Sequence, residues 1–262
     1  MGLFAENLLA GRCAFVAGGT SGINLGIAKR LAELGARVAV AGRDPQKAAA
    51  AAQAIGPGAL GLSCDVREYP LIQAAIETTA GSFGSLDIVI SGAAGNFLAP
   101  AAGMSANAFR TVVDIDLNGT FNVFRAAYDL LRKPGASLIA ISAAQAVTPV
   151  MLQAHACAAK AGIDQLVRVL AMEWGPSGVR VNALSPGPIA GTEGMARLAP
   201  TEQAVAEKTA RIALRRFGTI EEIADCAVFL CMAGYMTGTT LECDGGSRLG
   251  DASDRMGSVG ER

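Results

Sequence analysis

The chain has 262 residues, of which 51% are hydrophobic and 17% are charged, and its formal net charge is −1. This composition supplies a sizeable apolar core and argues against intrinsic disorder. A charge near zero, with no basic stripe along any segment, also argues against nucleic acid as a partner.

Seven short apolar runs alternate with longer helical segments from one end of the chain to the other. This alternation is typical of a parallel sheet whose two faces are covered by helices. Because no linker or repeat interrupts it, we predict a single doubly wound α/β domain of the Rossmann type over residues 1–262. Strands are expected at 13–17, 37–42, 60–64, 86–91, 137–142, 180–184 and 239–243.

A glycine-rich turn follows the first predicted strand and opens the first predicted helix. Backbone N–H groups in such a turn can approach a pyrophosphate closely, and the helix N-terminus favours its negative charge. Its place in the first βαβ unit favours a dinucleotide site over a tight turn without a ligand. Asn24 stands where a third small residue is usual, and we expect it to alter packing more than phosphate binding. The residues assigned to this turn are Gly18, Gly19, Thr20, Ser21, Gly22 and Ile23.

The second predicted strand ends at Gly42 and Arg43 rather than at a carboxylate. A site selective for NAD places a carboxylate there for the ribose 2′-hydroxyl, whereas an arginine suits a 2′-phosphate. Asp44 is adjacent, but Arg43 is nearer to the strand end, and Lys47 can assist it. We therefore expect NADP(H) rather than NAD as the cofactor.

The segment 154–174 is predicted to form a helix that is apolar on nearly every side, with Cys157, Leu166 and Met172 among its members. In a protein of this size, such a helix covers the sheet with one face and a second subunit with another. We therefore expect a homo-oligomer.

Six scattered cysteines and a single histidine, His155, form no CxxC pair, so we expect no bound metal. Glu6 and Arg12 interrupt the short apolar stretch near the N-terminus, which is unlike a signal peptide, and no apolar run reaches membrane-spanning length. The last three residues, 260–262, are Gly-Glu-Arg and differ from a Ser-Lys-Leu address. We expect a cytoplasmic protein without a membrane partner.

Taken in order, these segments resemble the short-chain dehydrogenase/reductase family over nearly the whole chain. The matching pieces include the glycine-rich turn and the pair Asp65 and Val66. The Asp65 carboxylate is placed to accept a hydrogen bond from the adenine amino group. A further match, 92–95, contains Ala93 and follows the fourth strand. In the family, the segment after the sixth strand lines the nicotinamide. The resemblance therefore assigns a nicotinamide-binding role to Gly187, Pro188, Ile189, Gly191 and Thr192.

The catalytic residues of that family do not all follow. Lys160 fits the family lysine, but the tyrosine position is Ala156 and the serine position is Ala143. The asparagine of the usual tetrad falls on Asp116. Carbonyl reduction needs the tyrosyl hydroxyl to give a proton to the new alkoxide, which an alanine cannot do.

One branch of the family, the peroxisomal-type 2,4-dienoyl-CoA reductases, resembles this pattern and also lacks the tyrosine. The resemblance implies NADPH-dependent reduction of a conjugated C=C bond in an acyl-CoA, with Asp116 and Lys160 holding a water that serves as the acid. Lys160 would also bind the nicotinamide ribose. It further implies a substrate loop or lid around 190–216 and a homotetramer. The implied substrate contacts are Arg67, Phe97, Ser105, Asn107 and Arg197.

Alternative interpretations remain open at the level of sequence. A conventional 3-oxoacyl or alcohol reductase with a substitute acid, or a non-catalytic NADP-binding sensor or scaffold, would share the same cofactor segments. His155 neighbours the vacant tyrosine position, but adjacent helical residues point about 100° apart, so we expect a structural role for it. Ser142 precedes the vacant serine position and should face the other way on its strand.

Overall fold

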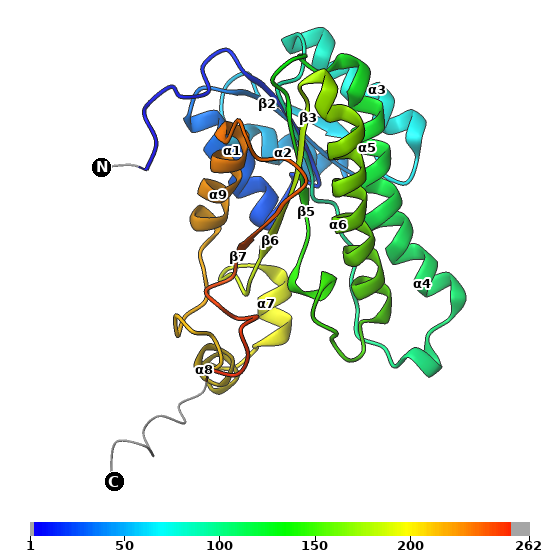
Figure 1. Cartoon of the computed structure of the whole chain (residues 1–262), viewed down its shortest axis with the longest axis vertical. Helices are drawn as coiled ribbons and strands as arrows, with labels where there is room; N and C mark the ends of the chain where they lie inside the picture. Colours follow the sequence, from blue (N-terminus) through cyan, green and yellow to red (C-terminus); the bar gives the residue numbers. More distant parts are fainter. Residues whose placement is uncertain (1–2, 253–262) are drawn as a thin grey trace.

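The computed structural model describes residues 3–252, which contain one sheet of seven parallel strands (Figure 1). The strand order is β3-β2-β1-β4-β5-β6-β7, so the chain reverses its direction of progress between β1 and β4. This order confirms the predicted doubly wound α/β domain. The strands are β1 (Cys13–Ala17), β2 (Arg37–Gly42), β3 (Leu60–Ser63), β4 (Ile88–Ser91), β5 (Ser137–Ile141), β6 (Arg180–Pro186) and β7 (Thr240–Cys243).

Helices cover both faces of the sheet, and each face has its own apolar cluster (Figure 1). One face carries α1 (Gly22–Glu33), α2 (Pro45–Ile55) and α9 (Ile220–Met232), which bury small and aliphatic side chains on the central strands. The other face carries the remaining long helices, and its cluster contains Phe15, Phe124 and Trp174. These helices are α3 (Tyr69–Phe83), α4 (Ala106–Val113), α5 (Gly119–Ala127) and α6 (Ala154–Trp174).

The helix ends follow from local sequence. Asp44 accepts hydrogen bonds from the N–H groups of Gln46 and Lys47 and so caps α2, while Pro45 occupies its first turn. Thr219 and Glu222 form the capping box of α9. Both helices therefore begin where their capping residues predict.

Two short helices, α7 (Glu193–Leu198) and α8 (Glu202–Ala210), form a lobe beyond the carboxyl ends of the strands (Figure 1). They occupy most of the segment 190–216. Backbone hydrogen bonds join Ala190 to Gly218 and Leu214 to Gly245, so the lobe is anchored on both sides to segments that border the sheet.

The predicted strands are correct except at their ends. The fourth strand begins at Ile88 instead of residue 86, and Leu86 instead forms an isolated bridge with Leu131. The sixth strand extends to Pro186, two residues beyond its predicted end. Within residues 3–252, no helix has the length and apolar character needed to cross a membrane. The tripeptide at 260–262 lies outside the described residues.

Candidate active site

The glycine-rich turn lies at the switch point of the sheet, between β1 and β4. The Gly92 N–H donates to the Ala17 carbonyl at 3.0 Å, which brings the two strand ends together. A Cβ on Gly18 would lie 2.6 Å from the backbone nitrogen of Ala93, and the φ of Gly18 is +74°. Only glycine fits here without strain. A Cβ on Gly22, by contrast, would meet no atom within 4 Å, so open space adjoins the start of α1.

The N-terminus of α1 lacks a side-chain cap. Ser21 is its N-cap residue, yet the Ser21 side chain makes no capping hydrogen bond. The first N–H groups of a helix need partners, and a phosphate is well suited to provide them. Asn24 donates through Nδ2 to the carbonyl oxygens of Gly18 and Gly92, at 3.3 and 2.8 Å. Asn24 therefore ties the turn to the end of β4, and the expected effect on packing is what the structure shows.

The end of β2 has a free arginine and an engaged aspartate. Asp44 caps α2, as described above, whereas Arg43 is exposed. Gly42 is required by close packing, because a Cβ there would lie 2.7 Å from Cγ2 of Thr20. The carboxylate of Asp44, which made the cofactor prediction from sequence ambiguous, is thus occupied in capping α2. Arg43 is the charged side chain that remains at the end of β2.

Asp65 and Arg67 pair with each other beyond β3. The Arg67 guanidinium donates to both Asp65 oxygens, with a shortest distance of 2.6 Å. This pairing, rather than the weaker influence of Arg43, holds the pKa of the Asp65 carboxyl below its usual range. The sequence analysis assigned Asp65 to the adenine amino group and Arg67 to the substrate. Binding of either ligand to its assigned residue would therefore compete with the Asp65–Arg67 ion pair. Val66 is buried against Gly119.

Asp116 lies in a π-helical turn, Asp114–Asn118, that separates α4 from α5. Such single turns are frequent at functional sites because they re-aim side chains of an otherwise regular helix. The Asp116 side chain is 1% exposed and accepts the Gly95 N–H through Oδ1 at 2.7 Å. A carboxylate this deeply buried needs a positive partner.

That partner is Lys160, on α6. Its Nζ lies 3.2 Å from Asp116 Oδ2 and donates to the Ile141 carbonyl at 2.9 Å. The lysine side chain is 10% exposed, so Lys160 is the member of the pair that is more open to a ligand. The sequence-predicted catalytic pair is therefore brought together, from two elements 44 positions apart in the chain.

The vacant tyrosine position lies one helical turn before Lys160, and the vacant serine position lies two residues after Ile141, to which Lys160 donates. Ala143 begins the turn after β5, and Ala156 is buried in the first turn of α6. Ser142 points elsewhere: its hydroxyl donates to Asp164 of α6 at 2.5 Å. His155 is fully buried, and its Nδ1 accepts the Ala156 N–H at 2.9 Å. This contact supports a structural role for the histidine.

The predicted substrate contacts are spread over several elements. Phe97 packs edge-on against the His155 ring with centroids 4.2 Å apart, and its loop starts at Gly95, so it lies near the Asp116–Lys160 pair. Ser105 caps α4, and Asn107 is an exposed residue of that helix. Arg197 is paired with Glu193 at 3.0 Å on the exposed surface of α7. Of these five residues, Phe97 is the one that the described contacts place near the Asp116–Lys160 pair.

The segment after β6 is fixed by contacts with the end of β7, the neighbouring strand. The Gly187 N–H donates to the Cys243 carbonyl at 3.0 Å, and a Cβ on Gly187 would lie 2.5 Å from Cα of Asp244. Thr192 caps α7 and donates to the carbonyl of Ile189 at 2.9 Å. The residues assigned to the nicotinamide thus form one compact turn above the carboxyl end of β6.

Two backbone groups and an amide network complete the site, and one of the backbone groups belongs to the family-matching segment 92–95. The Gly95 N–H and the Ile141 carbonyl orient the two charged side chains. Gln153 is buried and accepts from the side chains of Asn96 and Gln145, which joins the loop after β4 to the loop after β5. Because these groups act through the backbone or through an amide network, residue type alone does not identify them.

The chain is similar to known proteins over most of its length. A family model described as enoyl-(acyl carrier protein) reductase matches residues 17–248. A short chain dehydrogenase from Bacillus anthracis has a TM-score of 0.81 and 37% identity, over 90% of this chain and 96% of its own. The chain belongs to the short-chain dehydrogenase/reductase family. It is therefore an oxidoreductase whose family membership implies a nicotinamide cofactor.

Curated relatives of this short-chain dehydrogenase/reductase share one kind of name. The chain is 42% identical to a peroxisomal 2,4-dienoyl-CoA reductase of Pongo abelii, over 97% of this chain and 90% of that protein. It is 40% identical to one from Saccharomyces cerevisiae, over 94% and 87%. A probable 2,4-dienoyl-CoA reductase of Bacillus subtilis is 37% identical, over 91% and 97%. These relatives confirm the resemblance that the sequence motifs indicated.

Proposed function

We propose that this protein uses NADPH to reduce the conjugated double bond of a 2,4-dienoyl-CoA or a related enoyl thioester. The observation that carries the proposal is the buried Asp116–Lys160 ion pair beside an alanine at the family tyrosine position. The site retains the lysine of a short-chain reductase and lacks the hydroxyl that ketone reduction needs. The relatives named for dienoyl-CoA reduction support the same choice of reaction.

The residues present fit a dinucleotide. The glycine cradle at Gly18, the open space at Gly22 and the uncapped start of α1 suit a pyrophosphate. Arg43 at the end of β2 suits a 2′-phosphate, so we assign NADP(H). Lys160 would hold the nicotinamide ribose, and the turn 187–192 would line the nicotinamide.

When bound, the cofactor supplies a hydride to the far end of the diene. Negative charge then spreads toward the thioester oxygen, and a proton must reach carbon. The Lys160 ammonium and the Asp116 carboxylate would hold the water that delivers this proton. Asp116 holds Lys160 in place, and the Gly95 N–H holds Asp116 in place.

The acyl-CoA would lie between this pair and the lobe of α7 and α8. Phe97 borders the pair and offers an apolar surface. Arg67 and Arg197 would meet CoA phosphates only after leaving Asp65 and Glu193, to which they are now bound. Their exposed ion pairs are individually weak, so exchange for a phosphate has a small cost.

The direct test is an absorbance assay with the purified protein, NADPH and 2,4-dienoyl-CoA thioesters of several chain lengths. We expect the NADPH and dienoyl absorbances to fall together. Absence of turnover at every chain length, with NADPH bound, would overturn the proposal in favour of a non-catalytic NADP-binding sensor or scaffold. Reduction of 3-oxoacyl or alcohol-type substrates that survives Asp116→Asn would favour a conventional reductase with another acid.

Two further parts of the proposal concern assembly and compartment. The outer face of α6 exposes Val169 and Met172, at 41% and 80%, while its inner face is buried in the sheet cluster. These exposed apolar side chains, which lie beside the exposed Arg168, support a homo-oligomer, for which we propose a tetramer. We propose the cytoplasm as the compartment of this protein. Several relatives are named peroxisomal, and cell fractionation distinguishes the two compartments.

A further inference from the structure

Two loops lead outward from the Asp116–Lys160 pair at the carboxyl end of the sheet. The loop after β4 contains Gly95, whose N–H donates to Asp116, and the loop after β5 starts beside Ile141, whose carbonyl accepts from Lys160. Each loop therefore begins at a backbone group that holds one member of the pair. Both loops lie at the same end of the molecule as the lobe of α7 and α8 (Figure 1).

Hydrogen bonds join the two loops farther from the pair. Asn96 donates through Nδ2 to Oε1 of Gln153 at 2.8 Å. The Ala99 N–H donates to the Leu152 carbonyl at 2.9 Å. These bonds hold the loops side by side, so the surface that the loops form is continuous with the candidate active site.

This two-loop surface, made of residues 96–99 and 147–152, is exposed and apolar. Neither 88–109 nor 134–159 contains a Lys, Arg, Asp or Glu. The exposed large apolar side chains of the surface are Phe97, Leu98, Val147, Val150, Met151 and Leu152. Met151 is the most exposed of them, at 87%. Apolar side chains that gather on the exterior of a protein mark a surface that binds something.

Leu152 has a backbone conformation that few leucines adopt. Its φ is +68°, in the left-handed region that favours glycine. The side chain is exposed, so packing in the core does not compensate for this strain. Strained residues cluster where a protein contacts its ligand, which supports a binding role for the leucine side chain.

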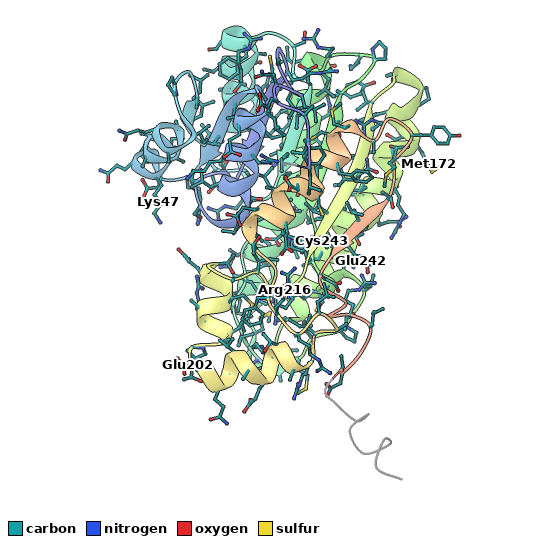
Figure 2. The ribbon with its side chains drawn as sticks, turned by 90° about the vertical axis from the view of Figure 1, so that its left-hand side faces the viewer. Lys47, Met172, Glu202, Arg216, Glu242 and Cys243 are labelled. Carbon is teal, nitrogen blue, oxygen red and sulfur yellow. The ribbon has the colours of Figure 1, made fainter. Side chains whose placement is uncertain are left out.

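The lobe of α7 and α8 differs from the two-loop surface in its charge. Residues 190–216 contain five basic and three acidic side chains. Figure 2 shows two of them, Glu202 on α8 and Arg216 where the lobe meets the rest of the molecule. A site with a charged lobe and an uncharged apolar surface suits an amphiphile, whose polar head and apolar tail leave the reacting atoms in different directions.

We propose that the two-loop surface binds the apolar acyl tail of the substrate, and that the protein therefore favours long-chain over short-chain acyl thioesters. This inference rests on the proposed acyl-CoA function of the site. The diene lies at the Asp116–Lys160 pair, the CoA phosphates lie toward the lobe, and the tail passes Phe97 and reaches Met151. The buried His155 ring, with its centroid 4.2 Å from that of Phe97, supports Phe97 for this contact.

Isothermal titration of the full-length protein with saturated acyl-CoAs, in the presence of NADP⁺, tests the tail contact without turnover. The series runs from hexanoyl-CoA to myristoyl-CoA, below the concentrations at which these thioesters form micelles. Complete burial of a CH₂ group strengthens binding about fourfold, so a surface that covers one side of the tail should give roughly twofold per CH₂. Equal affinity across the series, or no binding, would overturn the proposal. Length-dependent binding without turnover of any dienoyl-CoA would refute the proposed reaction and support the tail contact.

Leu98→Asn combined with Met151→Asn tests where the tail lies. We expect myristoyl-CoA to bind about tenfold more weakly, and hexanoyl-CoA, whose chain is too short to reach these residues, to bind as before. Leu71→Asn, at an exposed leucine of α3, is the matched control and should change neither affinity. An unaltered dependence on chain length in the double variant would overturn the assignment of the tail to this surface.

Leu152→Gly separates binding from folding. Glycine adopts this φ without strain, so the variant should melt no lower than the unsubstituted protein and should still bind myristoyl-CoA several-fold more weakly. Sedimentation with phosphatidylcholine vesicles and light scattering complete the test on the Leu98→Asn, Met151→Asn protein. Loss of vesicle binding or of assembly in that protein, with its acyl-CoA affinities unchanged, would overturn the proposal and assign the surface to a membrane or to a second copy.

Discussion

Asp116 and Lys160 form a buried ion pair, with 3.2 Å between Oδ2 and Nζ, and each is also held by one backbone group. The Gly95 N–H holds the carboxylate and the Ile141 carbonyl holds the ammonium. Asp116 and the Ile141 carbonyl thus hold the charged nitrogen of Lys160, and the Gly95 N–H holds Asp116 in turn. Breaking a buried pair from one side leaves the other charge uncompensated, which makes the pair a sensitive target for substitution.

Asp116→Asn tests the carboxylate. We expect a loss of turnover with dienoyl-CoA of about 10²–10⁴, the typical contribution of a positioned acid. NADPH affinity should change little, because Asn can still accept the Gly95 N–H. Stopped-flow kinetics and fluorescence titration measure the two effects. Asp114→Asn, in the same π-helical turn, is the matched control and should retain activity.

Lys160→Ala tests the partner with two proposed tasks. We expect both the rate and the affinity for NADPH to fall, since the lysine would hold the proton-delivering water and the nicotinamide ribose. Arg168→Ala removes a cation from the exposed side of the same helix and should leave both unchanged. A Lys160→Ala protein that loses turnover but binds NADPH with full affinity would contradict the ribose contact.

Arg43→Leu tests cofactor selection. Because Asp44 is used to cap α2, Arg43 is the charged group at the end of β2 that can meet a 2′-phosphate. We expect NADPH binding to weaken far more than NADH binding, and Arg43→Lys to retain part of the preference. Isothermal titration with both cofactors gives the comparison. An equal loss for the two would show that the 2′-phosphate lies elsewhere.

Glu222→Gln tests a pH dependence of stability. The hydrogen bond from Arg216, and after it the Thr219 N–H, lower the pKa of the Glu222 carboxyl from 4.5 to about 2. Its contribution is therefore present above pH 4.5 and is lost as the pH falls toward 2. An exposed pair contributes about 0.2–1 kcal/mol, so the variant should melt no more than about 4 °C lower at neutral pH. Calorimetry should show this difference shrinking between pH 4.5 and pH 2, and Glu221→Gln should show none.

Val169→Glu combined with Met172→Glu tests the exposed face of α6. Charges on this face should disfavour contact between subunits without disturbing the buried face that packs on the sheet. We expect light scattering to report a smaller assembly than for the unsubstituted protein, with an unchanged circular dichroism spectrum. The same assembly size in both proteins would place the interface on another surface.

Several features were predictable from local sequence because local chemistry decides them. Alternating apolar runs with helical segments led to seven parallel strands, and Thr219 with Glu222 predicted the capping box that begins α9. Gly18 was predictable as a turn residue because its left-handed φ disfavours any side chain. Lys160 could be singled out because it stands at the lysine position of the family motif, on a helix that is largely apolar. These inferences need only residues close together in the chain.

Tertiary structure decided the rest, since it depends on groups far apart in sequence. No local pattern shows that Asp116 meets Lys160, because a π-helical turn and the crossing of α6 create that contact. Sequence thus determined which chemical groups the chain possesses, and packing determined which of them can act together.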